Sequence, residues 1–319
     1  MQKENELKHQ SVMLQEIVAG LRPQAGDIFI DATVGGGGHS LALATKIGVT
    51  GCLIGFDLDR DTLNRAREVL KNYLGQLYLF HANFKNMNYF LADLAIGQVD
   101  GILFDLGLST YLLEDRNRGF SFMKDGPLDM RLDSSFTTTA AEIINRSSQG
   151  DLENIFRTYG EEPRSKHYAR IIASHSRKTK IESTRQLWQL IRENTRSQWQ
   201  RKMKIDPATR IFQALRIAVN QELDNLKAAL PIAVDILRPG KRLAVISFHS
   251  LEDGITKRYF QQEAKDCLCP PSLPICGCNH KKKVKIITRK PLRPTPQEIN
   301  QNRRARSACL RIVERLPLN

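Results

Sequence analysis

Residues 27–40, with the sequence DIFIDATVGGGGHS, indicate the fold class because an apolar run leads directly into four successive glycines. Residues 27–32 are typical of a buried parallel strand. The glycines let the backbone turn sharply and approach a ligand without a Cβ in the way. In open α/β sheets the ligand lies beyond the carboxyl ends of the strands, so this loop is predicted to hold a nucleotide-like cofactor. A flexible turn is the alternative interpretation.

Further apolar runs follow at the spacing of βαβ units, in which parallel strands alternate with helices. They cover residues 52–57, 77–82 and 101–108. Between them, residues 59–70 repeat apolar positions at helical spacing and begin with acidic residues, which suit a helix N-terminus. The first hundred residues therefore predict four parallel strands.

The alternation breaks after the fourth strand, because the next equally strong strand candidate is residues 242–248. The interval carries mostly helical patterns, which indicates an insertion. The long helix pattern at residues 208–230 is assigned to the core as the returning crossover. We therefore expect two core parts and an inserted, mostly helical domain, with the core at residues 1–110 and 209–319 and the insertion at residues 111–208.

Two strand patterns close the chain, at residues 283–289 and 308–315, and no helix is expected between them. Five strands of the doubly wound type followed by such a pair predict an antiparallel end to the sheet. The expected fold is α/β: a Rossmann-like seven-stranded sheet, typical of S-adenosylmethionine-dependent methyltransferases rather than dehydrogenases, with an inserted helical domain.

The residues around the glycine loop bear on which cofactor it holds. Counting from Gly35, the third glycine of a dinucleotide fingerprint falls on Ser40, so that match is imperfect. Asp57 ends the second strand, where an acidic residue accepts hydrogen bonds from ribose hydroxyls in both cofactor classes. No phosphate-directed basic residue lies near the loop, which favours S-adenosylmethionine because it carries no phosphate. Phe84 follows the third strand, where it would pack against adenine or serve as a core aromatic.

Charge is the feature of the composition that departs from the globular average. Lys plus Arg is 48 and Asp plus Glu is 34, a formal net charge of +14, which calls for a polyanionic partner. Residues 164–210 hold 13 basic and 3 acidic residues, and residues 281–315 hold 12 and 2, so each stretch has a net charge of +10. Trp188 and Trp199 lie in the first stretch and could stack on unpaired bases, although Trp188 also fits a helix core.

The apolar runs and the cysteines bear on the compartment. No run approaches 18 apolar residues, and the N-terminal residues are polar, so we expect no membrane span, no secretory signal and a cytoplasmic protein. In that compartment cysteines are reduced or bound to metal. Five soft ligands fall within 14 residues, which allows either a tetrahedral zinc site or a reduced Pro-rich loop; they are Cys267, Cys269, Cys276, Cys278 and His280.

Several motifs together resemble the MraW (RsmH) family, bacterial methyltransferases that modify N4 of a cytidine in small-subunit (16S) ribosomal RNA. The matching stretches follow the family order along nearly the whole chain: HQSVMLQE (9–16), DATVGGGGHS (31–40), DGILFDLGLS (100–109), RGFSFMKDGPLDMRLD (118–133), ATRIFQALRIAVNQEL (208–223), ISFHSLED (246–253) and RARSACLRI (304–312). The run at 118–133 is the most specific of them.

The resemblance implies an S-adenosylmethionine site and a 16S ribosomal RNA or small-subunit partner. It also implies that the inserted helical domain is an RNA-binding or substrate domain. The cofactor-binding residues that it implies are Gly37, Gly38, His39, Asp57, Phe84 and Asp105. One position departs from the family, which follows its LG-x-SS segment with Pro-Gln, the Gln contacting the cofactor. Here Leu112 stands at the Gln position, so that side-chain contact is absent or replaced.

The expected reaction needs a residue that orients a weakly nucleophilic cytosine amine, and no metal is required for it. Asp105 ends the fourth strand and is the first candidate, alongside its cofactor role. His249 is the second, with Ser247 and Ser250 beside it, although Ser250 also fits a helix N-cap. A non-catalytic RNA-binding ribosome-assembly factor on the same fold is the alternative function. A nucleotide-dependent oxidoreductase would need the glycine that Ser40 replaces.

Residues 118–133 form a polar segment with turn signals at Gly119 and at Gly126-Pro127. It follows the fourth strand, so it is expected either to cover the site as a lid or substrate contact, or to dock the inserted domain.

Overall fold

The computed structural model describes residues 11–195, 206–270 and 276–317. The chain divides into two compact units. The first, called here the sheet unit, consists of Met1–Gly107 and Leu223–Asn319, and the second, the helical unit, is Leu108–Glu222. The helical unit interrupts the sequence of the sheet unit after the fourth strand.

Seven strands form one mixed sheet in the sheet unit, in the order β3-β2-β1-β4-β5-β7-β6. Strands β1 to β5 pair in parallel, and β7 is antiparallel to both of its neighbours. The predicted α/β fold with a seven-stranded sheet is confirmed. The strands are β1 (Ile28–Asp31), β2 (Cys52–Asp57), β3 (Gln76–His81), β4 (Val99–Asp105), β5 (Leu237–Ser247), β6 (Val284–Ile286) and β7 (Cys309–Arg315).

The connection between β6 and β7 differs from the prediction of two strands without a helix between them. It contains the helix α14 (Pro296–Gln301) and a 3-10 helix (Arg303–Ser307). Thr295 caps α14 by accepting a hydrogen bond from the Glu298 N–H, and Pro296 occupies the first turn. A helix of six residues is too short to show a periodic apolar face, which is why its sequence reads as a loop.

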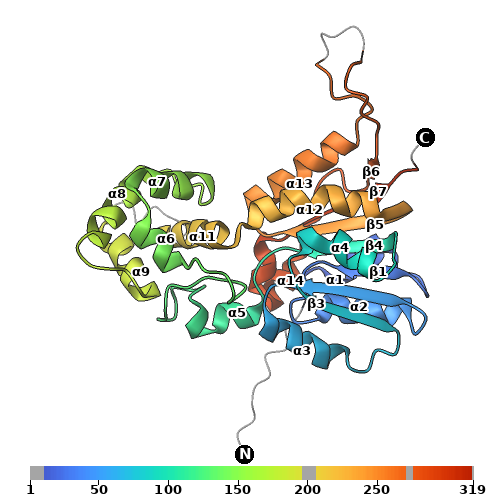
Figure 1. Cartoon of the computed structure of the whole chain (residues 1–319), viewed down its shortest axis with the longest axis horizontal. Helices are drawn as coiled ribbons and strands as arrows, with labels where there is room; N and C mark the ends of the chain where they lie inside the picture. The colour runs from blue at the N-terminus through green and yellow to red at the C-terminus, as the bar shows by residue number, and fades with distance from the viewer. Residues whose placement is uncertain (1–10, 196–205, 271–275, 318–319) are drawn as a thin grey trace, which may run out of the picture. The chain divides into compact units, whose positions relative to one another are not determined.

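Helices cover both faces of the sheet, as right-handed crossovers between parallel strands require. In Figure 1, α1, α2 and α3 lie on one face, and α4, α12 and α13 lie on the other. Their bounds are α1 (Leu14–Leu21), α2 (Gly38–Ile47), α3 (Arg60–Leu70), α4 (Met87–Asp93), α12 (Glu222–Ile236) and α13 (Ser250–Glu263). Every residue of β2 and β4 is therefore buried except the last one of each strand, which is partly exposed.

The helical unit packs around its own hydrophobic core. Three of its helices begin with capping boxes, which start at Thr139, Ser148 and Ser183. No helix in the described part of the chain is long and apolar enough to cross a membrane. Within residues 108–195 and 206–222, the α-helices of this unit are α5 (Thr110–Glu114), α6 (Ala140–Arg146), α7 (Gln149–Thr158), α8 (Ser165–Ser176), α9 (Thr184–Glu193) and α11 (Pro207–Asn220).

The long helix pattern at residues 208–230 forms two helices rather than one. Gln221 adopts a left-handed conformation (φ 52°) that ends α11, and α12 begins at the next residue. Ile211 and Leu215 of α11 are buried in the core of the helical unit. The assignment of this whole pattern to the sheet core was therefore wrong for its first half, because a helical apolar stripe does not reveal which core it faces.

Residues 118–133 are bound into the helical unit by backbone hydrogen bonds. The Leu128 N–H donates to Glu182 O at 2.8 Å, and the Thr184 N–H donates to Gly126 O at 2.9 Å. Asn220 Oδ1 accepts from the Leu132 N–H at 2.7 Å. These bonds support the interpretation that the segment docks onto the inserted domain, and its role as a lid or substrate contact stays a prediction.

Candidate active site

Three parallel strands of the sheet unit end on an aspartate at the same edge. Asp31, Asp57 and Asp105 are the last residues of β1, β2 and β4, and β1 pairs in register with both other strands. The carboxyl ends of parallel strands meet at one edge, so three carboxylates gather there. Sequence reasoning identified Asp57 and Asp105. It missed Asp31, which carries the same signal of a carboxylate closing an apolar strand.

The glycine turn connects β1 to α2 with two left-handed residues, Gly35 (φ 53°) and Gly37 (φ 82°). A Cβ on Gly37 would lie 3.2 Å from the Ala66 Cα, and a Cβ on Gly38 would collide with the Ser11 hydroxyl. A Cβ on Gly35 would meet only Thr33 O, at 3.9 Å. Gly37 and Gly38 are therefore required by packing inside the protein, whereas Gly35 presents an open face to a ligand.

Asp57 stabilises the glycine turn through hydrogen bonds to the backbone. Its Oδ2 accepts a hydrogen bond from the Gly35 N–H at 2.9 Å, and its Oδ1 accepts one from the Asp59 N–H at 2.9 Å. Burial raises the pKa of Asp57 to about 6, although the two backbone N–H groups favour its ionised form. Each carboxylate oxygen can accept more than one hydrogen bond, so Asp57 keeps capacity for ribose hydroxyls.

Asp31 is fully buried and partnered. The Ser40 hydroxyl donates to Asp31 Oδ2 at 2.6 Å, and the Thr33 N–H donates to Oδ1 at 3.2 Å. Burial raises the pKa of Asp31 in spite of these hydrogen bonds. Ser40, which a dinucleotide fingerprint would replace with glycine, thus supports the loop from inside the sheet unit.

His39 and Asp105 lie next to each other at this edge of the sheet. His39 Nε2 lies 3.4 Å from Asp105 Oδ2. Burial disfavours protonation of His39, but its contact with Asp105 and the nearby Asp31 outweigh burial and raise the pKa of His39. His39 Nδ1 and Asp105 Oδ1 are buried and have no hydrogen-bond partner among the described residues. Buried polar atoms in folded proteins nearly always have a partner, so these two atoms are suited to hydrogen bonds with a ligand.

Phe84 begins a 3-10 helix (Phe84–Asn86) directly after β3. Its ring makes an edge contact with Phe104 of β4, with ring centroids 5.3 Å apart. Phe84 is only partly buried, so it is both a neighbour of the core and an exposed aromatic surface at the strand ends. Both interpretations of this residue are compatible with its position.

The arrangement fits S-adenosylmethionine. A partly buried carboxylate, an open glycine and a partly exposed aromatic ring lie after neighbouring strands, which suits a ribose and an adenine ring. The unpartnered atoms of His39 and Asp105 add polar groups that a bound amino acid or sulfonium moiety would contact. Two predicted binding residues, Gly37 and Gly38, act through the shape of the turn.

The end of β5 brings the second group of candidates to the same edge. Asp105 and Ile246 are register partners on β4 and β5. His249, rather than the predicted Ser250, occupies the cap position before α13. Its Nε2 lies 3.1 Å from Glu252 Oε1, and the N–H groups of Phe248 and His249 donate to Glu252 Oε2 at 2.8 and 3.3 Å. Glu252, buried and missed by sequence reasoning, therefore fixes the turn that carries His249.

Two residues singled out in the sequence are packed in the helical unit. Leu112 is buried in its hydrophobic core, so the side chain at the position of the family glutamine offers no polar contact. Trp188 packs against the same core and donates from its indole N–H to Asp206 Oδ2 at 3.3 Å. Arg192 lies over its ring, 4.8 Å from the centroid. Trp199 lies outside the described residues.

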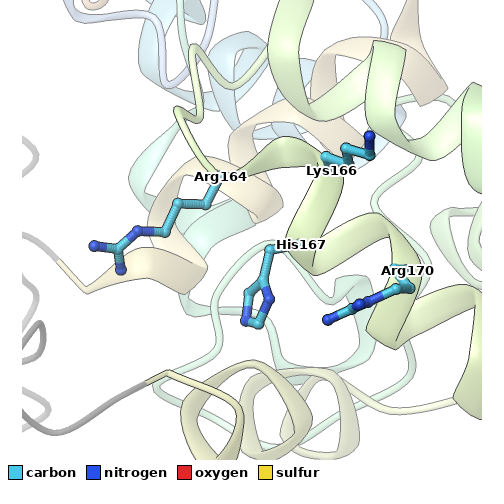
Figure 2. Close-up of a pocket in the computed structure, with 4 residues that line it drawn as sticks. All are labelled: Arg164, Lys166, His167 and Arg170. Carbon is cyan, nitrogen blue, oxygen red and sulfur yellow. The ribbon is translucent and has the colours of Figure 1, made fainter.

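The helical unit carries a basic pocket of about 390 Å³ at the start of α8, lined by Arg164, Lys166, His167 and Arg170. Figure 2 shows Arg170 directed toward His167, whereas Arg164, which precedes α8, and Lys166 point away from them. His167 Nε2 lies 3.0 Å from Asn194 O. All four lining residues belong to the first basic stretch of the sequence.

The second basic stretch is partly neutralised inside the sheet unit. Arg311 is buried and forms two hydrogen bonds with Asp253, at 2.7 and 2.9 Å. Lys283 Nζ lies 2.9 Å from Asp235 Oδ1. A net charge of +10 in the sequence therefore overstates the positive charge that this stretch presents to a ligand.

Comparisons with known proteins place these features in a family context. The profile described as the MraW methylase family matches residues 6–316. A protein from Syntrophotalea carbinolica named "Ribosomal RNA small subunit methyltransferase H" is 47% identical over 309 residues, covering 97% of this chain and 98% of the relative. Proteins of the same name from Thermomicrobium roseum and Finegoldia magna are 46% and 43% identical, covering 97% and 98% of this chain and 94% and 99% of the relatives.

Proposed function

The chain belongs to the MraW methylase family, and from this premise we propose that it is an S-adenosylmethionine-dependent enzyme that methylates the exocyclic N4 of a cytidine in 16S ribosomal RNA. The full-length similarity to proteins named for small-subunit ribosomal RNA methylation supports the substrate. The observation that carries the chemistry is the gathering of Asp57, Asp105 and His39 at the glycine turn.

The exocyclic amine of cytosine is a poor nucleophile because its lone pair is delocalised into the ring. S-adenosylmethionine, when bound, supplies an electrophilic methyl group on a sulfonium. The protein then has to hold the amine in line with that methyl group, and positioning of this kind lowers a barrier by about 7 to 11 kcal/mol in well-oriented cases. The functional residues are therefore expected to position groups rather than to form covalent intermediates.

We assign to Asp105 the role of accepting a hydrogen bond from the cytosine amine. Its Oδ2 faces His39, while its buried Oδ1 has no hydrogen-bond partner among the described residues. An acceptor at Oδ1 can take a hydrogen bond from the amine N–H and favour a pyramidal nitrogen. Burial disfavours the protonated imidazole, but the contact of His39 Nε2 with Asp105 Oδ2 raises the pKa of His39, so the proton that His39 holds faces this carboxylate oxygen and leaves Oδ1 for the amine.

His249 is assigned to orienting the base, as a positioning residue on the neighbouring strand end. The hydrogen bonds of Glu252 fix the backbone before α13, so the imidazole is held at one place on the edge. Ser247 ends β5, and its buried hydroxyl has no hydrogen-bond partner among the described residues. The polar atoms of Ser247 and His249 that have no hydrogen-bond partner among the described residues support this role.

The basic pocket of the helical unit is proposed to bind the phosphate backbone of the RNA. Three cationic side chains and His167 line this pocket, which suits an anion, and each phosphate contact steepens the salt dependence of binding by about 0.7 to 0.9 in the log–log slope. The partner is 16S ribosomal RNA or the small ribosomal subunit, and the compartment we propose is the cytoplasm, where that RNA is found.

The test of the reaction is methyl transfer to small-subunit particles and to free 16S RNA, followed by mass spectrometry of the nucleosides. N4-methylcytidine is the expected product. Methyl found only on C5 of cytosine, or only on protein, would exclude the N4 assignment. The alternative of a non-catalytic assembly factor predicts no binding of S-adenosylmethionine, so calorimetric binding in the micromolar range counts against it.

One single variant and one double variant separate the role of Asp105 in catalysis from that of the basic pocket in RNA binding. Asp105→Asn should lower kcat by about 10²- to 10⁴-fold, the range seen for loss of a positioned acid or base, whereas the exposed control Asp93→Asn should leave it unchanged. Lys166→Glu with Arg170→Glu should weaken RNA binding and flatten its salt dependence without changing cofactor affinity. Lys71→Glu, an exposed lysine of the sheet unit, is its control.

A further inference from the structure

Four cysteines of the sheet unit meet in an arm between α13 and β6 that the methyltransferase reaction does not use. They are Cys267, Cys269, Cys276 and Cys278. Figure 1 shows this part of the chain as an extended loop projecting beyond the end of α13. The two Cys-x-Cys pairs come from opposite sides of the loop, so their convergence depends on the fold and not on sequence spacing alone.

The distances between the sulfurs match those of a tetrahedral metal site. All four Sγ atoms lie within 4.8 Å of one another. Cys267 Sγ lies 3.3 Å from Cys276 Sγ and 3.7 Å from Cys278 Sγ, and the last two lie 3.6 Å apart. A zinc–sulfur distance of about 2.3 Å puts the corners of a regular tetrahedron about 3.8 Å apart. None of these cysteines is in a disulfide.

Backbone groups around the cluster are arranged to support thiolates. The Leu268 N–H donates to Cys278 Sγ at 3.3 Å, and the Cys269 N–H donates to Cys267 Sγ at 3.3 Å. Hydrogen bonds of this kind orient metal ligands and stabilise their negative charge. Thiols are weak hydrogen-bond donors, so their contacts with one another do not account for the convergence of four of them.

The arm has no hydrophobic core that would hold it together. Among the described residues from 264 to 283, none is buried, and Cys267, Cys276 and Cys278 are exposed. Small structural elements without a core are commonly held by a disulfide or a metal. The nearby His280 contacts Gln262 O through Nε2 at 3.2 Å, so its ring is engaged outside the cluster and the candidate ligand set is four sulfurs.

We propose that Cys267, Cys269, Cys276 and Cys278 bind one Zn²⁺ ion that fixes the arm between α13 and β6. Soft thiolate ligands in a tetrahedral arrangement select zinc over oxygen-preferring cations. Four protein ligands leave no open position for water or substrate, so the site is structural rather than catalytic. The ion would hold the chain that leads into the basic residues Lys281–Lys283 and β6.

The experiment measures metal in the full-length protein, expressed in medium with zinc and purified with a reductant and without a chelator. About one zinc per chain is expected by plasma mass spectrometry, and less than about 0.1 would overturn the proposal. Iron in place of zinc would also overturn it. Cys276→Ser and Cys278→Ser should each reduce the zinc content at least about tenfold, whereas Cys52→Ala, a buried cysteine of β2, should retain it.

A second measurement does not depend on the variants folding. The wild-type protein is stripped with a chelator and titrated with Co²⁺, and tetrahedral thiolate coordination should give intense d–d absorption with thiolate-to-cobalt charge transfer, saturating at one equivalent. An octahedral cobalt spectrum would contradict the proposal. Recovery of the four cysteines as disulfides from the reduced preparation, by differential alkylation and mass spectrometry, would contradict it as well.

Discussion

Cofactor affinity should fall when the pH is lowered through 6, because Asp57 must be ionised to accept hydrogen bonds from a ribose. Burial raises the pKa of Asp57 to about 6. Protonation turns one of its oxygens into a donor and removes the negative charge that strengthens hydrogen bonds to the carboxylate. Protonation of Asp57, which burial favours, therefore competes with binding of the cofactor.

The size of the effect follows from the ionised fraction. With a pKa of about 6, roughly nine tenths of Asp57 is ionised at pH 7 and roughly one tenth at pH 5. If only the ionised form binds, the dissociation constant of S-adenosylmethionine rises about tenfold between these values, which corresponds to about 1.4 kcal/mol. Above pH 7 the contribution of Asp57 should be flat.

The assay is calorimetric titration of the protein with S-adenosylmethionine at several pH values between 5 and 8. Asp57→Asn is the informative variant, since it should bind more weakly at pH 7 and lose this part of the pH dependence. His39 and Asp31 also have raised pKa values, and any titration that remains in Asp57→Asn belongs to them. A wild-type affinity that is constant from pH 5 to pH 8 would refute the role assigned to Asp57.

Unfolding at low pH caused by Asp57 would not explain a weaker affinity for S-adenosylmethionine. A carboxyl group whose pKa is higher in the folded than in the unfolded protein binds more protons when folded, so its contribution to stability falls as the pH rises from about 4 to about 6. At Asp57, acidification therefore favours the folded protein while it weakens the cofactor complex. Thermal unfolding at pH 5 and pH 7 separates the two effects.

Three further predictions concern stability. Gly37→Ala should destabilise the sheet unit by about 1 to 2 kcal/mol because of its left-handed backbone, whereas Gly97→Ala, with open space around it, should not; thermal unfolding compares them. Asp253→Asn leaves Arg311 without its carboxylate and should cost about 1 to 3 kcal/mol in urea unfolding at pH 7. Burial alone would raise the pKa of Asp253, but its hydrogen bonds with Arg311 and Cys309 lower it, so this contribution should be lost as the pH falls below about 4. Phe156→Ala leaves a cavity at a fully buried site in the helical unit and should lower the free energy of unfolding in urea by about 3 to 5 kcal/mol.

Much of the sheet could be predicted from local sequence. The apolar runs at residues 52–57 and 77–82 are strands within one residue of the expected bounds. For β2 the reason is burial on both faces, which leaves a continuous apolar signature; β3 has an apolar sequence too, although it is the edge strand and is only partly buried. Asp57 and Asp105 were placed at strand ends by the same reasoning. The helix expected at residues 59–70 is α3, and the structure adds that Asp59 caps it by accepting a hydrogen bond from the Thr62 N–H.

Other features depend on contacts between distant parts of the chain. The pairing of β7 between β5 and β6, the division of the helix pattern at Gln221, and the bond between Ser40 and Asp31 carry no local signal. The cysteines show the difference clearly: their spacing left zinc and a reduced loop both open, and the convergence of four sulfur atoms favours zinc.

The sequence by itself determined the strands of the sheet, the glycine turn and the family resemblance, because these depend on periodicity and on motifs of consecutive residues. Only the tertiary structure decided which polar atoms meet, as at His39 and Asp105, and which charges face a ligand or one another, as at Arg311 and Asp253. Burial sets the cost of an unpaired charge, and burial depends on the complete packing of the chain.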